Sequence, residues 1–90
     1  MAGYRVLIKP SAAKEIEAVG RKKDRERLVG HIRALGSEPR PQGCEKLSDQ
    51  YGLLRVRVGS YRIVYTIDDG SAPVHVVKVG HRKDVYRRSG

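Results

Sequence analysis

The amino-acid sequence predicts an α+β domain, with an N-terminal strand and a two-helix hairpin packed on one face of a mainly antiparallel sheet of four to five strands. Apolar residues recur at helical spacing only between positions 11 and 36. Short runs rich in β-branched residues lie before and after that region, and short turns separate the later runs. The length of 90 residues suits one core, so we expect residues 1–90 to form a single domain.

The first part of the chain predicts a strand followed by a helix. Tyr4 to Ile8 is a short run of β-forming residues, and Pro10 ends it. Ser11 is suited to cap the N-terminus of a helix, and Gly20 is suited to end that helix. The apolar positions between them recur at helical spacing: Ala12, Ile16 and Val19.

A second helix is predicted after a short basic run. Asp24 is the expected N-cap, and Gly36 is the expected C-terminal stop. One apolar stripe lies between them, formed by Leu28, Ile32 and Leu35. The other face of this helix is charged, which indicates a solvated exterior or, as an alternative, contact with RNA.

The rest of the chain predicts a sheet. The stretch from Ser37 to Gly43 holds two prolines and a glycine, so it is a connection between the helices and the sheet. The three predicted strands are Leu53 to Val58, Tyr61 to Asp68 and Val74 to Gly80, and a shorter strand is expected near Cys44 to Leu47. Consecutive strands with short turns indicate an antiparallel meander.

The strand from Leu53 to Val58 predicts two different sheet faces. Side chains alternate along a strand, so Leu54, Val56 and Val58 share an apolar face. Arg55 and Arg57 then point together to the other side of the sheet. Since both helices are expected to cover the apolar face, the sequence predicts a basic patch on the uncovered one.

Charge and composition narrow the possible partners. Nineteen Lys and Arg against ten Asp and Glu give a formal net charge of +9 and a pI of about 10.1. A polyanionic partner follows, either nucleic acid or an acidic protein, and charge alone does not separate these from a merely solvated basic surface. The single cysteine, Cys44, implies a reducing cytoplasm. No membrane span is expected, because no stretch reaches roughly 18 apolar residues. No metal site or cofactor is expected either, because His31 and His75 lack companions at ligand spacing.

The end of the chain carries the residue types that metal-free RNA cleavage uses. The ribose 2′-hydroxyl must lose a proton and attack phosphorus, negative charge on the phosphorane must be balanced, and the leaving 5′-oxygen must gain a proton. Arginine suits the charge-balancing step, because its fork binds two phosphate oxygens and stays protonated. A tyrosine ring can stack on a splayed base.

Two runs of residues resemble the signature of RelE-type toxins, in the RelE/ParE toxin superfamily. They extend from Leu54 to Tyr65 and from Val76 to Tyr86, and the expected element order also matches. The resemblance implies a type II toxin that cleaves messenger RNA on the ribosome and needs no cofactor. The run from Gly80 to Tyr86 favours this branch over ParE-type inhibitors of DNA gyrase.

The resemblance also implies roles for individual residues. Arg62 matches the arginine that stabilises transition-state charge, and Arg82 matches the one that protonates the leaving oxygen. Tyr86 matches the tyrosine that stacks on the substrate base. Arg55 stands in place of a lysine that supports the attack. The remaining basic positions are expected to bind RNA phosphates: Arg57, Lys83, Arg87 and Arg88.

The general base is the position at which this chain departs from the family. A lysine proposed for this role in relatives corresponds to Leu53, which cannot take a proton. His81 is a candidate substitute, because an unperturbed imidazole titrates near pH ~6.5. Alternation places His81 and Arg82 on opposite sides of the strand unless a turn follows Gly80.

The resemblance implies a cognate antitoxin, together with the ribosome and its messenger RNA, as partners in the cytoplasm. The free toxin is expected to be monomeric, and its complex with the antitoxin is expected to be oligomeric. Two alternatives remain open at this stage. One is a ParE-like inhibitor of DNA gyrase, and the other is a catalytically weak, basic RNA-binding module.

Overall fold

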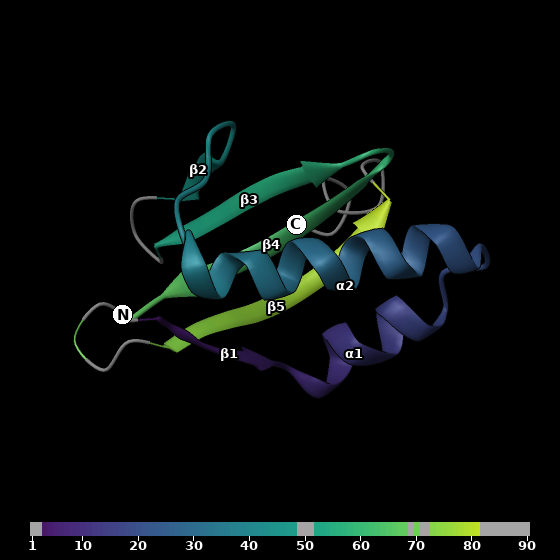
Figure 1. Ribbon diagram of the computed structural model, residues 1–90, viewed down its shortest axis with the longest axis horizontal. Helices are drawn as coiled ribbons and strands as arrows, with labels where there is room; N and C mark the ends of the chain where they lie inside the picture. Colours follow the sequence, from purple (N-terminus) through teal and green to yellow (C-terminus); the bar gives the residue numbers. More distant parts are fainter. Residues whose placement is uncertain (1–2, 49–51, 69, 71–72, 82–90) are drawn as a thin grey trace.

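A computed structural model of the chain describes residues 3–48, 52–68, 70 and 73–81 (Figure 1). Its helices and strands follow the predicted order. They are β1 (Arg5–Ile8), α1 (Pro10–Glu17), α2 (Lys22–Ser37), β2 (Glu45–Ser48), β3 (Leu53–Val58), β4 (Tyr61–Ile67) and β5 (Pro73–His81). Within these described residues, neither helix is long and apolar enough to cross a membrane.

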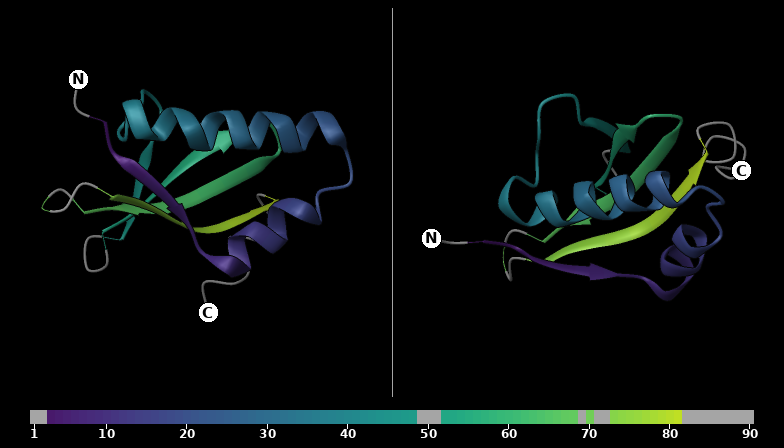
Figure 2. Two further views of the ribbon diagram at one scale, coloured as in Figure 1. Left: turned by 60° about the horizontal axis from the view of Figure 1, so that its bottom comes forward. Right: turned by 45° about the vertical axis from the view of Figure 1, so that its right-hand side comes forward.

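The five strands form one mixed sheet in the order β1-β5-β4-β3-β2. β1 pairs with β5 in parallel, whereas the other neighbours are antiparallel, so β2 to β5 form a meander. Both helices precede the meander in the chain and pack beside the same sheet (Figure 2). The predicted α+β class, with a helical hairpin on a mainly antiparallel sheet of five strands, is confirmed.

The starts of both helices differ from the prediction. α1 begins at Pro10, with Lys9 as N-cap, so the prediction of Ser11 as the cap was wrong. Proline suits the first helical position because its φ is already helical and its missing N–H would have no intrahelical partner. α2 begins at Lys22, and Asp24 lies in its first turn, where a carboxylate interacts favourably with the helix dipole.

Gly36 does not end α2 as predicted, because the helix continues to Ser37. The start of the chain crosses the helix at this residue, and the Tyr4 N–H donates a 2.7 Å hydrogen bond to the Gly36 carbonyl. A Cβ at position 36 would lie 2.9 Å from the Tyr4 oxygen. The glycine therefore permits a close crossing between α2 and the segment that leads into β1.

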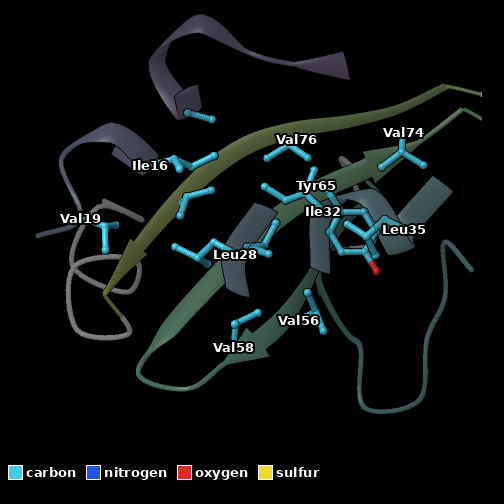
Figure 3. Close-up of a cluster of buried hydrophobic side chains, with 13 residues drawn as sticks. Ile16, Val19, Leu28, Ile32, Leu35, Val56, Val58, Tyr65, Val74 and Val76 are labelled. Atoms are coloured by element: carbon cyan, nitrogen blue, oxygen red, sulfur yellow. The ribbon is translucent and has the colours of Figure 1, made fainter. Parts of the chain in front are cut away.

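The core is aliphatic apart from tyrosine, as the absence of Phe and Trp requires (Figure 3). Tyr65 is fully buried, and the partly buried Tyr61 packs against the same cluster, so both tyrosines serve the core. Each helix and each of the three long strands contributes to this single cluster. Its fully buried members include Ala12, Leu28, Ile63, Val74 and Val76.

A β-bulge in β5 shapes the end of the sheet beside α1. The pairing with β4 shifts between the Val64–Lys78 pair and the Tyr65–Val76 pair. Glu15 of α1 accepts a 2.9 Å hydrogen bond from the Val79 N–H and a 2.8 Å hydrogen bond from the Lys78 ammonium. These contacts fasten the first helix to the end of β5.

Candidate active site on the open face of the sheet

The register of the sheet brings a carboxylate and three arginines onto one face. Glu45 of β2 lies opposite Arg55 of β3, and Arg57 of β3 lies opposite Arg62 of β4. Directly opposed residues share a sheet face, and alternation puts all four on the side away from Val56 and the core. We call this side, opposite the helices, the open face. The predicted pairing of Arg55 and Arg57 on one face is confirmed.

These side chains line a cavity of about 320 Å³. Its walls are Gln42, Gly43, Glu45, Arg55, Val56, Arg57 and Arg62, and we call it the arginine pocket. The pocket lies between the loop that precedes β2 and the centre of the meander. A rigid sheet therefore supports most of its charged groups.

The arginines of the pocket differ in exposure. Arg62 is only 5% exposed, although it carries a full charge, whereas Arg57 directly across from it is exposed. Like charges that face one another across strands destabilise a sheet by roughly 0.2–1 kcal/mol. A bound anion relieves that repulsion, and two guanidinium forks side by side match the oxygens of a phosphate.

Glu45 is the acidic group of the pocket. Its Oε1 accepts a 2.8 Å hydrogen bond from Arg55 Nε and a second bond from Arg55 Nη2. The hydrogen bond and the charge of Arg55 hold the pKa of Glu45 below its ordinary value. Arg62 and Arg57 act in the same direction, against an opposing effect of desolvation. Glu45 is therefore ionised at neutral pH and responds to all three arginines.

The loop before β2 is held against the sheet by Tyr65. Its hydroxyl donates a 2.8 Å hydrogen bond to the Pro39 carbonyl, while its ring fills the core. Burial raises the pKa of the Tyr65 phenol well above its usual range, and Cys44 adds to the effect. Gly43 has a φ of 93°, a conformation that favours glycine. The position of Glu45 thus depends on a core tyrosine and on one glycine turn.

His81 is not brought to the arginine pocket. It lies opposite Tyr61, whereas the adjacent pair is Arg62 and Gly80, so alternation turns His81 away from Arg62. The imidazole instead meets the Tyr61 ring edge to face, with ring centroids 5.7 Å apart. It lines a separate hollow beside Glu15 of α1. A catalytic role for His81 remains a prediction, and this geometry does not support it.

Five predicted site residues lie outside the residues that the structure describes. They are Arg82, Lys83, Tyr86, Arg87 and Arg88. Of the predicted set, the structure thus brings Arg55, Arg57 and Arg62 together. Leu53 is the first residue of β3, and alternation along the strand puts it on the same sheet face as Arg55. An aliphatic side chain therefore lies beside the three arginines.

The other histidines occur singly. His31 is exposed on α2, and His75 is exposed on β5. The described ranges contain no group of three His, Cys, Asp or Glu residues that could hold a metal ion. The charged groups that line the arginine pocket are three guanidinium groups and one carboxylate.

Sequence reasoning missed Glu45. The expected strand from Cys44 to Leu47 was not paired with its neighbour, and its acidic residue was given no role. Antiparallel pairing of that strand with β3 sets a carboxylate directly across from Arg55. An acidic residue in a strand next to an Arg-x-Arg strand was the available signal.

The fold and this pocket define a small, basic α+β protein with three arginines and one carboxylate gathered on the face of its sheet opposite the helices. The sequence model of the family described as "ParE toxin of type II toxin-antitoxin system, parDE" matches residues 6–86. Among curated proteins, the chain is 31% identical to Toxin RelE of Mycobacterium tuberculosis over 84 residues, covering 93% of this chain and 87% of that protein.

One further curated protein and one solved structure are similar to the chain and carry the same family name. The chain is 39% identical to Toxin RelG of Mycobacterium tuberculosis over 54 residues, which span 60% of this chain and 62% of that protein. Among solved structures, the archaeal RelE-RelB complex from Pyrococcus horikoshii matches with a TM-score of 0.79 and 26% identity, over 91% of this chain and 97% of the matched one. The chain belongs to the RelE/ParE superfamily of type II toxins, as a RelE-type toxin.

Proposed function

We propose that this chain is an endoribonuclease that cleaves messenger RNA on the ribosome, in the cytoplasm, and that a cognate antitoxin neutralises it. The observation that carries the proposal is the arginine pocket, in which one ionised carboxylate faces three arginines on an uncovered sheet. The similarity to RelE toxins supports the same activity. The whole chain, residues 1–90, acts as one domain in this proposal.

The arginines supply charge. In-line attack of the 2′-oxygen on phosphorus forms a pentacoordinate phosphorane, and its equatorial oxygens gain negative charge. Arg62 is held with little freedom by burial, so its charge is oriented before the substrate binds. Arg57 and Arg55 border the same cavity and bind the neighbouring phosphate oxygens.

Glu45 supplies the base. Among the described residues that line the arginine pocket, it alone offers a proton acceptor, because the arginines are protonated and the remaining groups are neutral. Glu45 takes the 2′-hydroxyl proton while the 2′-oxygen bonds to phosphorus. A phosphate that competes for Arg55 removes the hydrogen bonds that lower the pKa of Glu45, so substrate binding makes the carboxylate a stronger base.

The remaining step is departure of the 5′-oxygen. The P–O5′ bond breaks, and this oxygen takes a proton, for which we propose Arg82 as donor. Tyr86 stacks on the base beside the scissile bond, and Lys83, Arg87 and Arg88 bind flanking phosphates. The products are a 2′,3′-cyclic phosphate and a 5′-hydroxyl end.

The ribosome supplies alignment. The base is weak, and an arginine is a weak acid, so the chemical groups alone are modest catalysts. Orientation of the substrate can lower a barrier by several kcal/mol. Dependence on the ribosome follows, since the decoding centre holds messenger RNA in a fixed position.

The antitoxin is the second partner in this proposal. The solved relative from Pyrococcus horikoshii is a complex of RelE with RelB. A net charge of +9 favours an acidic partner that covers the basic surface. We propose that the free chain is monomeric and that the complex with the antitoxin is oligomeric.

A second candidate function is inhibition of DNA gyrase. The matching family model is the one described for ParE toxins, and Leu53 replaces the lysine expected of a RelE-type ribonuclease. Gyrase inhibition does not require the chemistry of Glu45 and Arg62. The same applies to a catalytically weak RNA-binding module, which would bind RNA in a salt-sensitive way without cutting it.

The test is a reconstituted translation reaction in which messenger RNA ends are mapped by primer extension. We expect discrete cuts with 5′-hydroxyl ends from wild type only when ribosomes are present. Arg62→Ala removes the cuts, whereas Arg21→Ala, with the same change of charge outside the pocket, retains them. Uncut message with folded wild type rejects the proposal, and a supercoiling assay with gyrase then decides between the two remaining functions.

A further inference from the structure

The last part of β5 is paired with a strand on one side only. β1 runs alongside β5 from Pro73 to Val76 and then leaves the sheet, because the chain enters α1 at Pro10. Past Val76, β4 is the only strand that pairs with β5 within the described residues. This end of β5 therefore has an open edge, whose backbone groups need other partners. α1 lies close to this end of the strand (Figure 2).

The β-bulge determines which residue of β5 lies beside the buried arginine of the pocket. The pairing with β4 shifts by one residue at Val77, which is the extra residue of the bulge. Even-numbered side chains face the core before the bulge and odd-numbered ones after it, as the burial of Val76 and Val79 shows. Gly80 consequently lies on the open face, directly opposite Arg62.

The bulge leaves the β5 side of Arg62 without a side chain. In an unshifted pairing, Val79 would lie opposite Arg62 on the open face, and Gly80 would face the core. The observed pairing puts a glycine beside the arginine instead. One residue farther along is His81, which immediately precedes Arg82 in the sequence. The position of this strand end therefore affects the space beside Arg62 and the residue that precedes the proposed proton donor.

A carboxylate of α1 holds this end of β5 directly after the bulge. Glu15 Oε1 accepts a 2.9 Å hydrogen bond from the Val79 N–H, and Glu15 Oε2 accepts a 2.8 Å hydrogen bond from the Lys78 ammonium. The side chains of Lys78 and Glu15 are 28% and 31% exposed, so both are partly shielded from water. Glu15 therefore provides at the open edge the acceptor that a neighbouring strand would provide.

The carboxylate is itself held in place by the core. Glu15 precedes Ile16 in α1, and both Ile16 and Ala12 of this helix are buried in the hydrophobic cluster. Glu15 is not among the residues that line the arginine pocket. Any effect of Glu15 on chemistry in that pocket must therefore act through β5.

We propose that Glu15 is a positioning residue for cleavage, because its hydrogen bond to Val79 fixes the bulged end of β5 and so the place of Gly80 beside Arg62. This role rests on the proposed function. A misplacement of about 1 Å can lower a rate by roughly 10²-fold, so a loosened strand end is enough to slow cleavage.

The test compares Glu15→Gln with Glu15→Met in single-turnover cleavage on programmed ribosomes. The two side chains have similar length and both lose the ion pair with Lys78, but only glutamine keeps an oxygen that accepts the Val79 N–H. At saturating ribosome concentration, we expect the rate to fall about tenfold in Glu15→Met and to stay within about threefold of wild type in Glu15→Gln. The half-saturating ribosome concentration is expected to change less than about twofold in both, because the pocket keeps its charges.

Three further measurements separate positioning from stability. Lys78→Met removes the ion pair and keeps the backbone contact, so its rate is expected to match that of Glu15→Gln. Hydrogen exchange of the Val79 amide is expected to be slow in wild type and in Glu15→Gln, and faster in Glu15→Met. Gly30 lies in the middle of α2, where a Cβ would meet nothing within 4 Å. Adding Gly30→Ala to Glu15→Met is therefore expected to restore the melting temperature and not the rate.

Equal rates for Glu15→Met and Glu15→Gln, with wild type cutting, overturn the positioning role and leave the proposed function intact. Recovery of the rate together with the melting temperature in the double variant means that Glu15 only stabilises the fold, and the inference is then wrong. A slow Glu15→Met whose Val79 amide stays protected also overturns it, because the effect does not pass through β5. Uncut message with folded wild type overturns the proposed function and, with it, any catalytic role of Glu15.

Discussion

The arginine pocket and helix α2 belong to the same small domain, and they differ in how far the fold accounts for their residues. In the pocket, a buried Arg62 lies opposite Arg57 on the neighbouring strand, so two like charges face one another and the pair suits the proposed anionic ligand. At Gly30 of α2, a glycine lowers helix stability, and a Cβ there would meet no atom of the described residues within 4 Å. Each region thus keeps a residue that is locally unfavourable: Arg62 because of its charge, and Gly30 because it lacks a side chain. The like-charged pair supports the polyanionic ligand that we propose for the pocket.

The largest effect is expected from neutralising Glu45, the carboxylate of the arginine pocket. Glu45→Gln is expected to lower the rate of ribosome-dependent cleavage by about 10²–10⁴, because an amide cannot accept the 2′-hydroxyl proton. Single-turnover cleavage on programmed ribosomes measures this rate. Glu17→Gln, on α1, is the matched control and keeps the wild-type rate. Equal rates for Glu45→Gln and wild type would exclude Glu45 as the base.

A substitution of Arg62 separates its contribution to cleavage from its contribution to stability. Arg62→Met keeps an unbranched side chain of similar length without charge. We expect cleavage to fall by about 10²–10³, as for loss of one group that stabilises transition-state charge. The melting temperature is measured alongside, because the change also removes the repulsion between Arg62 and Arg57, worth roughly 0.2–1 kcal/mol. A variant that is both inactive and less stable would mean that Arg62 is chiefly structural.

Two glycines of α2 sharpen the comparison within one helix. Gly36→Ala is expected to destabilise the fold by about 1 kcal/mol, because its methyl group presses on the Tyr4 backbone by more than the helix gains. Gly30→Ala is expected to stabilise the fold by up to about 1 kcal/mol. Urea denaturation of both variants measures the free energy of unfolding. The same sign for both would remove the argument that only one glycine serves the fold.

The smallest expected effect concerns the support of the pocket. Tyr65→Phe keeps the ring in the core and removes the hydrogen bond to the Pro39 carbonyl. The free energy of unfolding is expected to fall by about 1 kcal/mol. Cleavage is expected to fall more than this loss of stability explains, since the loop that leads into β2 and Glu45 loosens. Tyr61→Phe is the control, and it leaves the rate of cleavage unchanged.

Local sequence patterns predicted the meander well. β3 has the bounds that alternation indicated, because its two faces differ so clearly in polarity. The same alternation placed Arg55 and Arg57 correctly on the open face. Gly36 shows the limit of such reasoning, since a glycine near the end of a helical pattern suits a stop and a close crossing equally well. Only the contact with Tyr4 distinguishes the two.

The carboxylate of the pocket was beyond the reach of local patterns. Glu45 meets Arg55 through pairing across a loop, and the register of β2 shifts between Lys46 and Ser48. The burial of Arg62 likewise depends on what surrounds it in space, whereas composition suggests that arginines are exposed. Pairing between strands and burial of charge are tertiary properties, so the sequence indicated the basic members of the pocket and not its acid.

The pH dependence of cleavage tests the central claim most directly, that the carboxylate of the arginine pocket is the general base. The arginines lower the pKa of Glu45 in the free protein, and loss of the Arg55 hydrogen bonds on substrate binding returns it toward its ordinary range, so Glu45 stays ionised above that range. The single-turnover rate is therefore expected to show no acidic limb between about pH 5.5 and 7.5. An acidic limb within this range that His81→Gln abolishes would assign the base to the imidazole and contradict the account.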